Sequence, residues 1–192
     1  VVVSTDSLKI AKISKKYGAK VPFIRPNKFA RDNSPSYQAI IHCILYLQKK
    51  NKFYDYLVLL EPTSPLTTSI DIDLALKKLI KNKINANALV TVTKTQQSHP
   101  IFVIKKRKNN LIEPYLNKSF KFQRRQDISK TYFFDGSLYI SKVKTYLNKK
   151  TFNHSKTLAH ELNKYKYIEI DDKIDLQIAR LLFNNFVENK KN

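Results

Sequence analysis

The sequence contains no methionine and only one cysteine, Cys43. A single cysteine excludes an internal disulfide, which favours a reducing compartment such as the cytoplasm. No apolar run reaches the roughly 20 residues that a membrane-spanning helix needs, and the first residues do not resemble a signal peptide. We therefore expect a cytoplasmic protein with no membrane segment. Because Val1 stands where a start methionine would, we also expect that N-terminal sequence is missing.

Cysteine and histidine are too sparse to indicate a metal–thiolate centre. Cys43 lies in an apolar run with helical spacing, which favours a small core residue, with a catalytic thiol as the alternative. The histidines His42, His99, His154 and His160 are not spaced like the ligands of a zinc site. We therefore look for chemistry among the carboxylates and arginines.

Acidic residues are few as well: 15 Asp and Glu stand against 36 Lys and Arg, so the net charge is +21. A basic chain can bind nucleic acid, an anionic membrane or a small anionic substrate. Here the basic residues are scattered along the chain, and neither an RNA-binding signature nor zinc-finger spacing accompanies them. The pattern favours a solvated surface over nucleic-acid binding, and a basic nucleic-acid-binding module is kept as an alternative.

What is present is enough apolar material for one ordinary domain. The 192 residues are 42% hydrophobic and 11% aromatic, which is typical of a globular protein with a buried core. No internal repeat and no low-complexity linker interrupts the chain. We predict a single domain over residues 1–192.

The first half of the chain alternates between strand-like and helix-like stretches. The predicted strands are 1–3, 54–60 and 86–93, and the predicted helices are 7–17, 35 onward and 68–82. Strands that are apolar on both faces are typical of a buried parallel sheet. The alternation therefore predicts an α/β fold: a Rossmann-like, open, mostly parallel sheet flanked by helices.

Local signals mark where these helices begin and end. Gly18 stands where a left-handed residue is wanted after a helix. Ser34 is the expected N-cap of the second helix, with Pro35 at its first position. Thr68 and Asp71 have the spacing of a capping box at the start of the third.

The second half changes character from about residue 94 to 132, where the chain is polar, basic and broken by prolines. We interpret this segment as an insertion that leaves the main sheet, with "IKKRKNN" as a hairpin turn. "YFFDGSLYIS" then predicts strand, turn and strand. "KYKYIEI" predicts a final strand, followed by a helix whose Ile174, Ile178, Leu181 and Leu182 face inward.

Polar clusters follow three of the predicted strands. In an open parallel sheet, ligands bind at the carboxyl ends of strands, where loops lead into helix N-termini. "STDS", "EPTSP" and "EIDD" all fall at such ends. Taken alone, "EPTSP" has two interpretations, the floor of a site or a plain structural turn.

The last of these clusters offers metal ligands. Glu169 and Asp171 alternate along the predicted strand, so both carboxylates would point to the same side. Two such oxygen ligands suit Mg²⁺, which takes one or two carboxylates together with waters and phosphates. Asp172 and Asp175 have the spacing of N-cap and third residue of the final helix.

Five separated motifs carry a resemblance to a known family. They are "VVVSTDSLKIAKISKKYGAKVPFIRP", "FARDNSPS", "LLEPTSPLTT", "RRQDISKTYFFDGSLYIS" and "IEIDDKIDLQIA". In order and spacing the chain resembles the acylneuraminate cytidylyltransferases, the CMP-sialic acid synthetase family. The resemblance implies transfer of CMP from CTP to a nine-carbon 2-keto acid, a nonulosonic acid, with release of pyrophosphate. It also implies Mg²⁺ as cofactor and a homodimer whose subunits meet through the inserted segment.

The resemblance also assigns roles to residues of the first half. Arg25 matches the family arginine that contacts the nucleotide; an ordinary surface residue is the competing interpretation. Ser34 and Ser36 match serines at the base or ribose end, although Ser34 also suits a simple N-cap. Glu61 stands at the position that binds the sugar.

In the second half, Arg124 and Arg125 match the arginines that engage phosphate and substrate, and we expect them to be catalytic. Without the resemblance they would be an exposed basic pair. Tyr132 aligns with a substrate-side tyrosine, with a core aromatic as the alternative. Glu169 and Asp171 match the metal ligands.

Several positions depart from the family pattern. Glu61 replaces a glutamine, Thr67 replaces an arginine, and Asp135 replaces an asparagine before Gly136. Glu169 stands where aspartate is common. These changes fit a variant sugar such as legionaminic acid or another bacterial nonulosonate.

The family also begins with a strand and a glycine-rich phosphate loop that this chain lacks. We therefore expect these 192 residues alone to have little transferase activity. A catalytically inactive relative that serves as a dimer partner is the remaining alternative.

Overall fold

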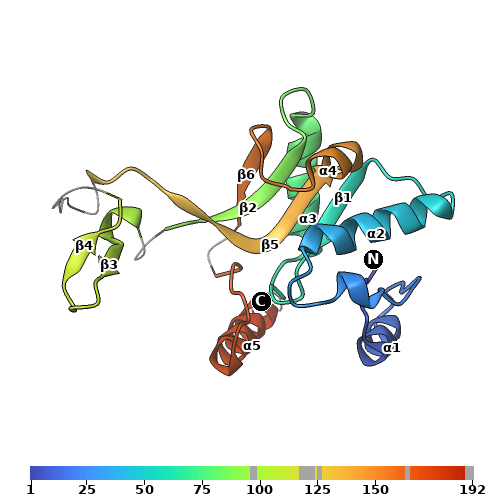
Figure 1. Ribbon diagram of the computed structural model, residues 1–192, viewed down its shortest axis with the longest axis horizontal. Helices are drawn as coiled ribbons and strands as arrows, with labels where there is room; N and C mark the ends of the chain where they lie inside the picture. Colours follow the sequence, from blue (N-terminus) through green and yellow to red (C-terminus); the bar gives the residue numbers. More distant parts are fainter. Residues whose placement is uncertain (96–98, 117–123, 125–126, 163–164, 189–192) are drawn as a thin grey trace. The chain divides into compact units, whose positions relative to one another are not determined.

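The computed structural model describes residues 1–95, 99–116, 124, 127–162 and 165–188 (Figure 1). The chain divides into two compact units. Unit 1 comprises Val1–Leu57 and Ser141–Phe152, and unit 2 comprises Val58–Ile140 and Asn153–Asn192. The assignment of 1–192 to one domain with an insertion at about 94–132 stays a prediction.

Unit 1 is mainly helical. Its elements are α1 (Leu8–Lys16), the 3-10 turn η1 (Asn27–Phe29), α2 (Ser36–Lys49) and α4 (Val143–Lys149). Ser7 begins α1, because its side chain accepts a hydrogen bond from the Ile10 amide at 3.3 Å. After α1, Gly18 adopts φ +84, so the predicted left-handed residue is confirmed.

Two local predictions in unit 1 are wrong. The apolar residues 1–3 do not form a buried strand: Val1 is 89% exposed, and Val2 makes only an isolated parallel bridge to Lys20. Ser34 does not cap α2, since Pro35 is the N-cap residue and makes no side-chain cap bond. The Ser34 hydroxyl instead donates to the Lys28 carbonyl at 3.1 Å and accepts from the Arg31 amide at 3.2 Å, so it bonds to the preceding loop.

Unit 2 contains most of a four-stranded sheet in the order β1-β5-β2-β6. The strands are β1 (Tyr56–Leu60), β2 (Ala88–Lys94), β5 (Tyr132–Lys142) and β6 (Thr157–Glu161). β2 and β6 are parallel, with Val90 opposite Ala159. β5 runs against β2, because Thr95 bonds to Thr131 while Thr91 bonds to Leu138. The sheet is therefore mixed.

The strand-turn-strand expectation for "YFFDGSLYIS" is wrong, because β5 is one continuous strand of 11 residues. Gly136, the residue that suggested a turn, adopts φ +73 inside the strand. A glycine in such a conformation marks an irregularity in the ladder rather than a chain reversal.

Helix α3 (Ser69–Lys81) packs on β2, and both elements contribute fully buried residues to the core. Ala75 and Leu79 of α3 and Ala88 and Leu89 of β2 are all 0% exposed. Thr68 and Asp71 form the predicted capping box, and the helix ends at the C-cap Asn82. The predicted helix is thus confirmed at both ends.

The segment expected to leave the main sheet contains a separate two-stranded sheet. β3 (Ile104–Lys106) and β4 (Ile112–Pro114) pair antiparallel, with Lys105 opposite Glu113. Asn110 at the tip has φ +65, as a tight turn requires. The hairpin predicted at "IKKRKNN" is confirmed.

The end of the chain differs from expectation. Residues 165–172 form neither helix nor strand, and the strand in this region is the earlier β6. Helix α5 (Lys173–Glu188) follows. Its expected inward residues are largely exposed, at 65% for Ile174 and Leu181, whereas Ala179 is buried. The predicted helix is confirmed, but the prediction of which residues face inward was wrong.

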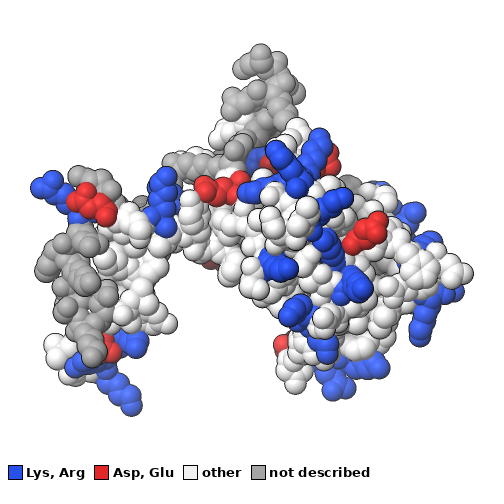
Figure 2. Space-filling model, turned by 90° about the horizontal axis from the view of Figure 1, so that it is seen from above, with Lys and Arg blue, Asp and Glu red and all other residues white. Residues whose placement is uncertain are grey.

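Charged side chains are spread over the surface. On the face in Figure 2, lysine and arginine side chains are separated by uncharged surface rather than gathered into one patch. Among the described residues, no helix has the length and apolar character needed to cross a membrane.

Candidate functional site

The "EPTSP" stretch forms a turn directly after β1. The Ser64 amide donates to the Glu61 carbonyl at 3.1 Å, which closes the turn, and Ser64 is only 4% exposed. Thr63 lies between the two prolines and leads toward the capped start of α3. The turn is therefore short and rigid, and it fixes where Glu61 and Thr63 lie.

Thr63 brings a distant part of the chain to this turn. Its carbonyl accepts a hydrogen bond from the Ile170 amide at 2.9 Å, and its hydroxyl donates to Glu169 Oε1 at 3.5 Å. The segment after β6 is thus attached to the segment after β1. The turn interpretation of "EPTSP" is confirmed, and its role as the floor of a site stays a prediction.

Gly136 of β5 supplies the opposite wall. A Cβ atom built on Gly136 would lie 3.4 Å from both carboxylate oxygens of Glu169. The absence of a side chain at Gly136 therefore lets the Glu169 carboxylate lie close to β5. The positive φ of +73 gives a second reason for glycine here.

The charges at this place influence one another. Burial raises the pKa of Glu61, and the nearby carboxylate of Glu169 raises it further. The pKa of Tyr139 is raised by burial and then by Glu61, Asp135 and Glu169. These groups therefore share one neighbourhood, in which an added negative charge is unfavourable and a cation is favoured. We call Glu61, Thr63, Gly136 and Glu169 the acidic cluster.

Asp135, the residue before Gly136 on β5, is 3% exposed. Its carboxylate accepts hydrogen bonds from the Thr91 hydroxyl at 2.5 Å, the Thr93 hydroxyl at 3.1 Å and the Ser137 amide at 3.0 Å. The carboxylate thus has three internal donors, as buried carboxylates require. This position fixes β5 to β2, rather than facing a ligand directly.

Asp171 and its neighbours hold the start of α5. Asp172 accepts from the Ile174 and Asp175 amides at 2.7 and 2.9 Å, so the predicted capping role is confirmed. Asp171 is exposed, and its amide donates to the Asp175 carboxylate at 3.1 Å. The argument that strand alternation puts Glu169 and Asp171 on one side does not hold, because this segment is not a strand.

The remaining predicted residues of unit 2 lie elsewhere or outside the described residues. Tyr132 is 42% exposed, and a hydrogen bond with Glu161, followed by burial, raises its pKa. Arg124 is exposed. Arg125 lies outside the described residues. The roles of these three side chains stay predictions.

Arg25, Ser34 and Ser36 belong to unit 1. The Arg25 amide donates to the Thr5 carbonyl at 2.8 Å, and its guanidinium pairs with Asp6 at 3.3 Å. The buried Nε of Arg25 has no partner among the described residues. Ser36 is exposed at the first turn of α2. Their roles toward a nucleotide stay predictions.

The structure also identifies residues that the sequence did not. Thr63, Gly136 and Tyr139 were not assigned to the site, and no local pattern indicated that Glu169 would lie against a residue of β5. Cys43 is half-buried, and burial raises the pKa of its thiol, which disfavours a catalytic thiolate.

With this geometry in place, comparison with known proteins gives a direct result. A family described as "Cytidylyltransferase" matches residues 1–190. The chain belongs to the cytidylyltransferase family. It is therefore a nucleotidyltransferase, as predicted.

Individual relatives of this cytidylyltransferase are bacterial. A pseudaminic acid cytidylyltransferase of Campylobacter jejuni is 28% identical over 186 residues, covering 95% of this chain and 77% of the relative. A CMP-N,N'-diacetyllegionaminic acid synthase of Legionella pneumophila is 29% identical over 183 residues, with the same two coverages. An N-acylneuraminate cytidylyltransferase of Escherichia coli is 28% identical, covering 93% of this chain and 41% of the relative.

Solved structures confirm the fold class. The structure of a CMP:2-keto-3-deoxy-manno-octonic acid synthetase complexed with CTP has a TM-score of 0.62 at 13% identity, covering 96% of this chain and 80% of that one. A 4-diphosphocytidyl-2C-methyl-D-erythritol synthase from Anaerococcus prevotii has a TM-score of 0.58 at 13% identity, covering 95% and 80%. At these identities the likeness concerns the fold alone.

We predict that Gly136→Ala impairs the site more than the fold. A methyl group there would contact both oxygens of Glu169 at 3.4 Å, and the positive φ costs a non-glycine residue about 1–2 kcal/mol. Gly18→Ala is the matched control, since Gly18 has φ +84 with nothing within 4 Å of its Cβ position. In the full-length protein both variants should lose similar unfolding free energy in urea, but only Gly136→Ala should lower kcat/KM, by roughly tenfold or more. Equal loss of kcat/KM in both variants would contradict this prediction.

We also predict that Glu61→Gln changes the pH dependence of stability. A carboxyl whose folded pKa is raised binds its proton more tightly in the folded state, so the wild-type protein loses stability as pH rises through that window. The variant lacks this loss. Its Tm advantage over wild type should therefore grow from about pH 4 to pH 7. Asp73→Asn, which removes an exposed carboxylate of α3, controls for net charge; parallel Tm curves for Glu61→Gln and wild type would refute the prediction.

Proposed function

We propose that this cytidylyltransferase transfers CMP from CTP to a nonulosonic acid of the sialic type and releases pyrophosphate. The relatives named for pseudaminic, N,N'-diacetyllegionaminic and N-acylneuraminic acids support this substrate class. The structural observation that carries the proposal is the acidic cluster, in which Thr63 holds Glu169 near Glu61 at the carboxyl end of β1. This edge is where open α/β sheets bind their ligands.

The reaction explains why positioned charges are needed. A hydroxyl oxygen of the sugar acid forms a bond to the α-phosphorus of CTP, and the bond from that phosphorus to pyrophosphate breaks. Negative charge develops on the phosphoryl oxygens and on the departing pyrophosphate, so catalysis consists mainly of orientation and charge stabilisation. In this proposal Arg124 and Arg125 bind phosphate and substrate, and Arg25 binds the nucleotide with Ser34 and Ser36.

The carboxylates of Glu169 and Asp171 suit Mg²⁺. Glu169 is exposed, bonded to the Thr63 hydroxyl, and close to Gly136. No group of three or more potential ligands occurs among the described residues. Two carboxylates with open positions match Mg²⁺, which keeps several waters and binds substrate phosphates. When bound, the ion would offset the negative charge of the triphosphate.

Glu61 is proposed to bind the sugar and to determine which sugar is preferred. Where a glutamine offers both a donor and an acceptor, an ionised carboxylate only accepts hydrogen bonds. Glu61 therefore favours a substrate group that donates, such as a hydroxyl or an amide, and disfavours a carboxylate next to it. Tyr132, on β5, is proposed to contact the same substrate.

The proposal includes a homodimer. The hairpin of β3 and β4 exposes apolar side chains that a second copy would cover. They are Ile104 at 45%, Leu111 at 59%, Ile112 at 53%, Tyr115 at 56% and Leu116 at 60% exposed. Apolar patches of this kind are typical of protein–protein contacts.

The metal assignment predicts the behaviour of two variants in the full-length protein. Glu169→Ala and Asp171→Ala should each lower Mg²⁺-dependent pyrophosphate release by at least about a hundredfold, because each removes one of two protein ligands. Asp172→Ala, which affects only the cap of α5, is the control for local unfolding. Mg²⁺-dependent turnover that survives in both ligand variants would dispose of the assignment.

The substrate assignment predicts that Glu61→Gln alters sugar choice. A panel of nonulosonic acids offered with CTP and Mg²⁺ should show release of pyrophosphate with at least one of them. Glu61→Gln should shift the ratio of kcat/KM between N-acetylneuraminic acid and the preferred acid by roughly tenfold, about the free energy of one hydrogen bond to a charged group. An unchanged ratio removes Glu61 from specificity, and no turnover with any acid rejects the substrate class.

A further inference from the structure

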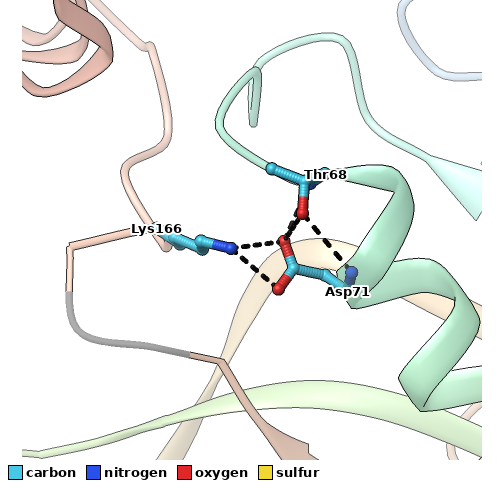
Figure 3. Close-up of polar contacts among 3 residues, drawn as sticks. All are labelled: Thr68, Asp71 and Lys166. Atoms are coloured by element: carbon cyan, nitrogen blue, oxygen red, sulfur yellow. Dashed lines mark hydrogen bonds and ion pairs between the residues drawn. The ribbon is translucent and has the colours of Figure 1, made fainter. Parts of the chain in front are cut away.

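Lys166 and Asp71 form a largely buried ion pair at the start of α3 (Figure 3). Their side chains are 14% and 10% exposed, whereas those of Arg25 and Asp6 are 25% and 44% exposed. The Lys166 ammonium donates to both carboxylate oxygens of Asp71, at 2.8 and 2.7 Å. Lysine is seldom buried unless paired.

Asp71 also completes the cap of α3. Its Oδ2 accepts from the Thr68 amide at 2.8 Å and from the Thr68 hydroxyl at 2.6 Å. Burial alone would raise the pKa of Asp71, but hydrogen bonds from Lys166 and Thr68 outweigh it, so the pKa is lowered. The carboxylate is therefore ionised and fixed at the start of α3, and Lys166 binds to a rigid anchor.

The ion pair joins two segments that both reach the acidic cluster. The turn carrying Glu61 and Thr63 leads directly into the capped end of α3, and Lys166 precedes Glu169 in the segment 165–172. That segment has neither helical nor strand hydrogen bonds, so a few contacts set its position. On the C-terminal side of Glu169 the Ile170 amide donates to Thr63. On the N-terminal side there are two contacts: the ion pair of Lys166, and the Tyr167 ring, which packs edge-on against Phe133 with 5.9 Å between the ring centroids.

A tether is needed here because like charges meet. Glu169 contacts Thr63, which is two residues after Glu61, and two ionised carboxylates in one neighbourhood repel each other. A segment without regular structure can relieve such repulsion by moving away. The Lys166 ion pair opposes that movement from a point three residues before Glu169.

We propose that Lys166 and Asp71 are positioning residues that hold Glu169 beside Thr63 and Glu61 in the absence of any ligand. The positional part rests on contacts alone. Its consequence for catalysis rests on the proposed function, in which Glu169 is a ligand of Mg²⁺. Buried ion pairs contribute little to stability compared with apolar packing, so a role in fixing one arrangement accounts for this pair better.

The test uses the full-length protein without nucleotide or metal. In Lys166→Met, amide hydrogen exchange at Ile170, whose N–H donates to Thr63, should become at least about tenfold faster. Exchange within the middle of α3 should stay unchanged, because Thr68 and Asp71 still form its cap. Lys166→Arg, which keeps the charge, should restore most of the protection.

Two further variants separate positioning from general destabilisation. Lys166→Met combined with Asp71→Asn removes both charges and leaves no unpaired buried carboxylate. If Lys166→Met alone does not fold, this double variant takes its place, and amide exchange at Ile170 should be at least about tenfold faster than in wild type. Lys78→Met is the matched control: this lysine of α3 donates to the Ala159 carbonyl at 2.7 Å, away from residues 165–172. It should leave exchange at Ile170 unchanged.

The catalytic arm measures the Mg²⁺ concentration for half-maximal activity. This concentration should rise by roughly tenfold or more in Lys166→Met, with kcat at saturating Mg²⁺ changed much less. If amide exchange at Ile170 is as slow in both the single and the double variant as in wild type, the inference is overturned, regardless of the rate of CMP transfer. Faster exchange with an unchanged Mg²⁺ requirement also overturns it, because the tether then does not act through Glu169. Absence of CMP transfer by wild type rejects the proposed function instead, and the exchange result still decides whether Lys166 holds the segment.

Discussion

The hydrogen bond from the Ile170 amide to the Thr63 carbonyl joins the two parts of the chain that carry the acidic side chains. Thr63 follows β1, and Ile170 follows β6, so neither segment could place Glu169 by itself. Because Thr63 is confined between two prolines in a closed turn, it offers a fixed acceptor. The position of Glu169 relative to Glu61 depends on this contact.

Several layers of structure support the contact without touching a ligand. Asp135 ties β5 to β2 through Thr91 and Thr93, and this places Gly136 against Glu169. The capping box of α3 fixes the other end of the turn. A site built this way separates the groups that meet substrate from the groups that hold them, as preorganised sites require.

The sequence predicted those features that local chemistry determines. The capping box of Thr68 and Asp71, the glycine after α1 and the hairpin at Asn110 each depend on a few neighbouring residues, and each is confirmed. The candidate Glu61 was found because "EPTSP" follows an apolar strand. Such inferences need no knowledge of distant contacts.

The features that failed depend on distant partners. "KYKYIEI" alternates like a strand, yet its Ile170 amide bonds to the Thr63 turn and Lys166 bonds to Asp71, and its described residues 165–170 form no strand. The run 1–3 is apolar enough for a buried strand, but its only backbone partner among the described residues is the segment around Lys20. Gly136 suggested a turn because glycine is common in turns. Its close approach to Glu169 could not be predicted, since the two residues lie far apart in the sequence. Periodicity identifies a face, but only the partner decides whether that face is buried.

The electrostatic effect of the many lysines extends over a longer distance than the contacts that hold the acidic cluster together. At physiological ionic strength, exposed charges are screened over about 8 Å, so scattered lysines give a general positive field without neutralising a particular carboxylate. The raised pKa of Glu61 agrees with this, since its causes are burial and Glu169, and no lysine offsets them. A net charge of +21 can attract an anion such as a nucleoside triphosphate toward the protein. Placing Glu169 in the neighbourhood of Glu61 requires short contacts instead, such as the hydrogen bonds to Thr63 and, in our proposal, the Lys166 ion pair.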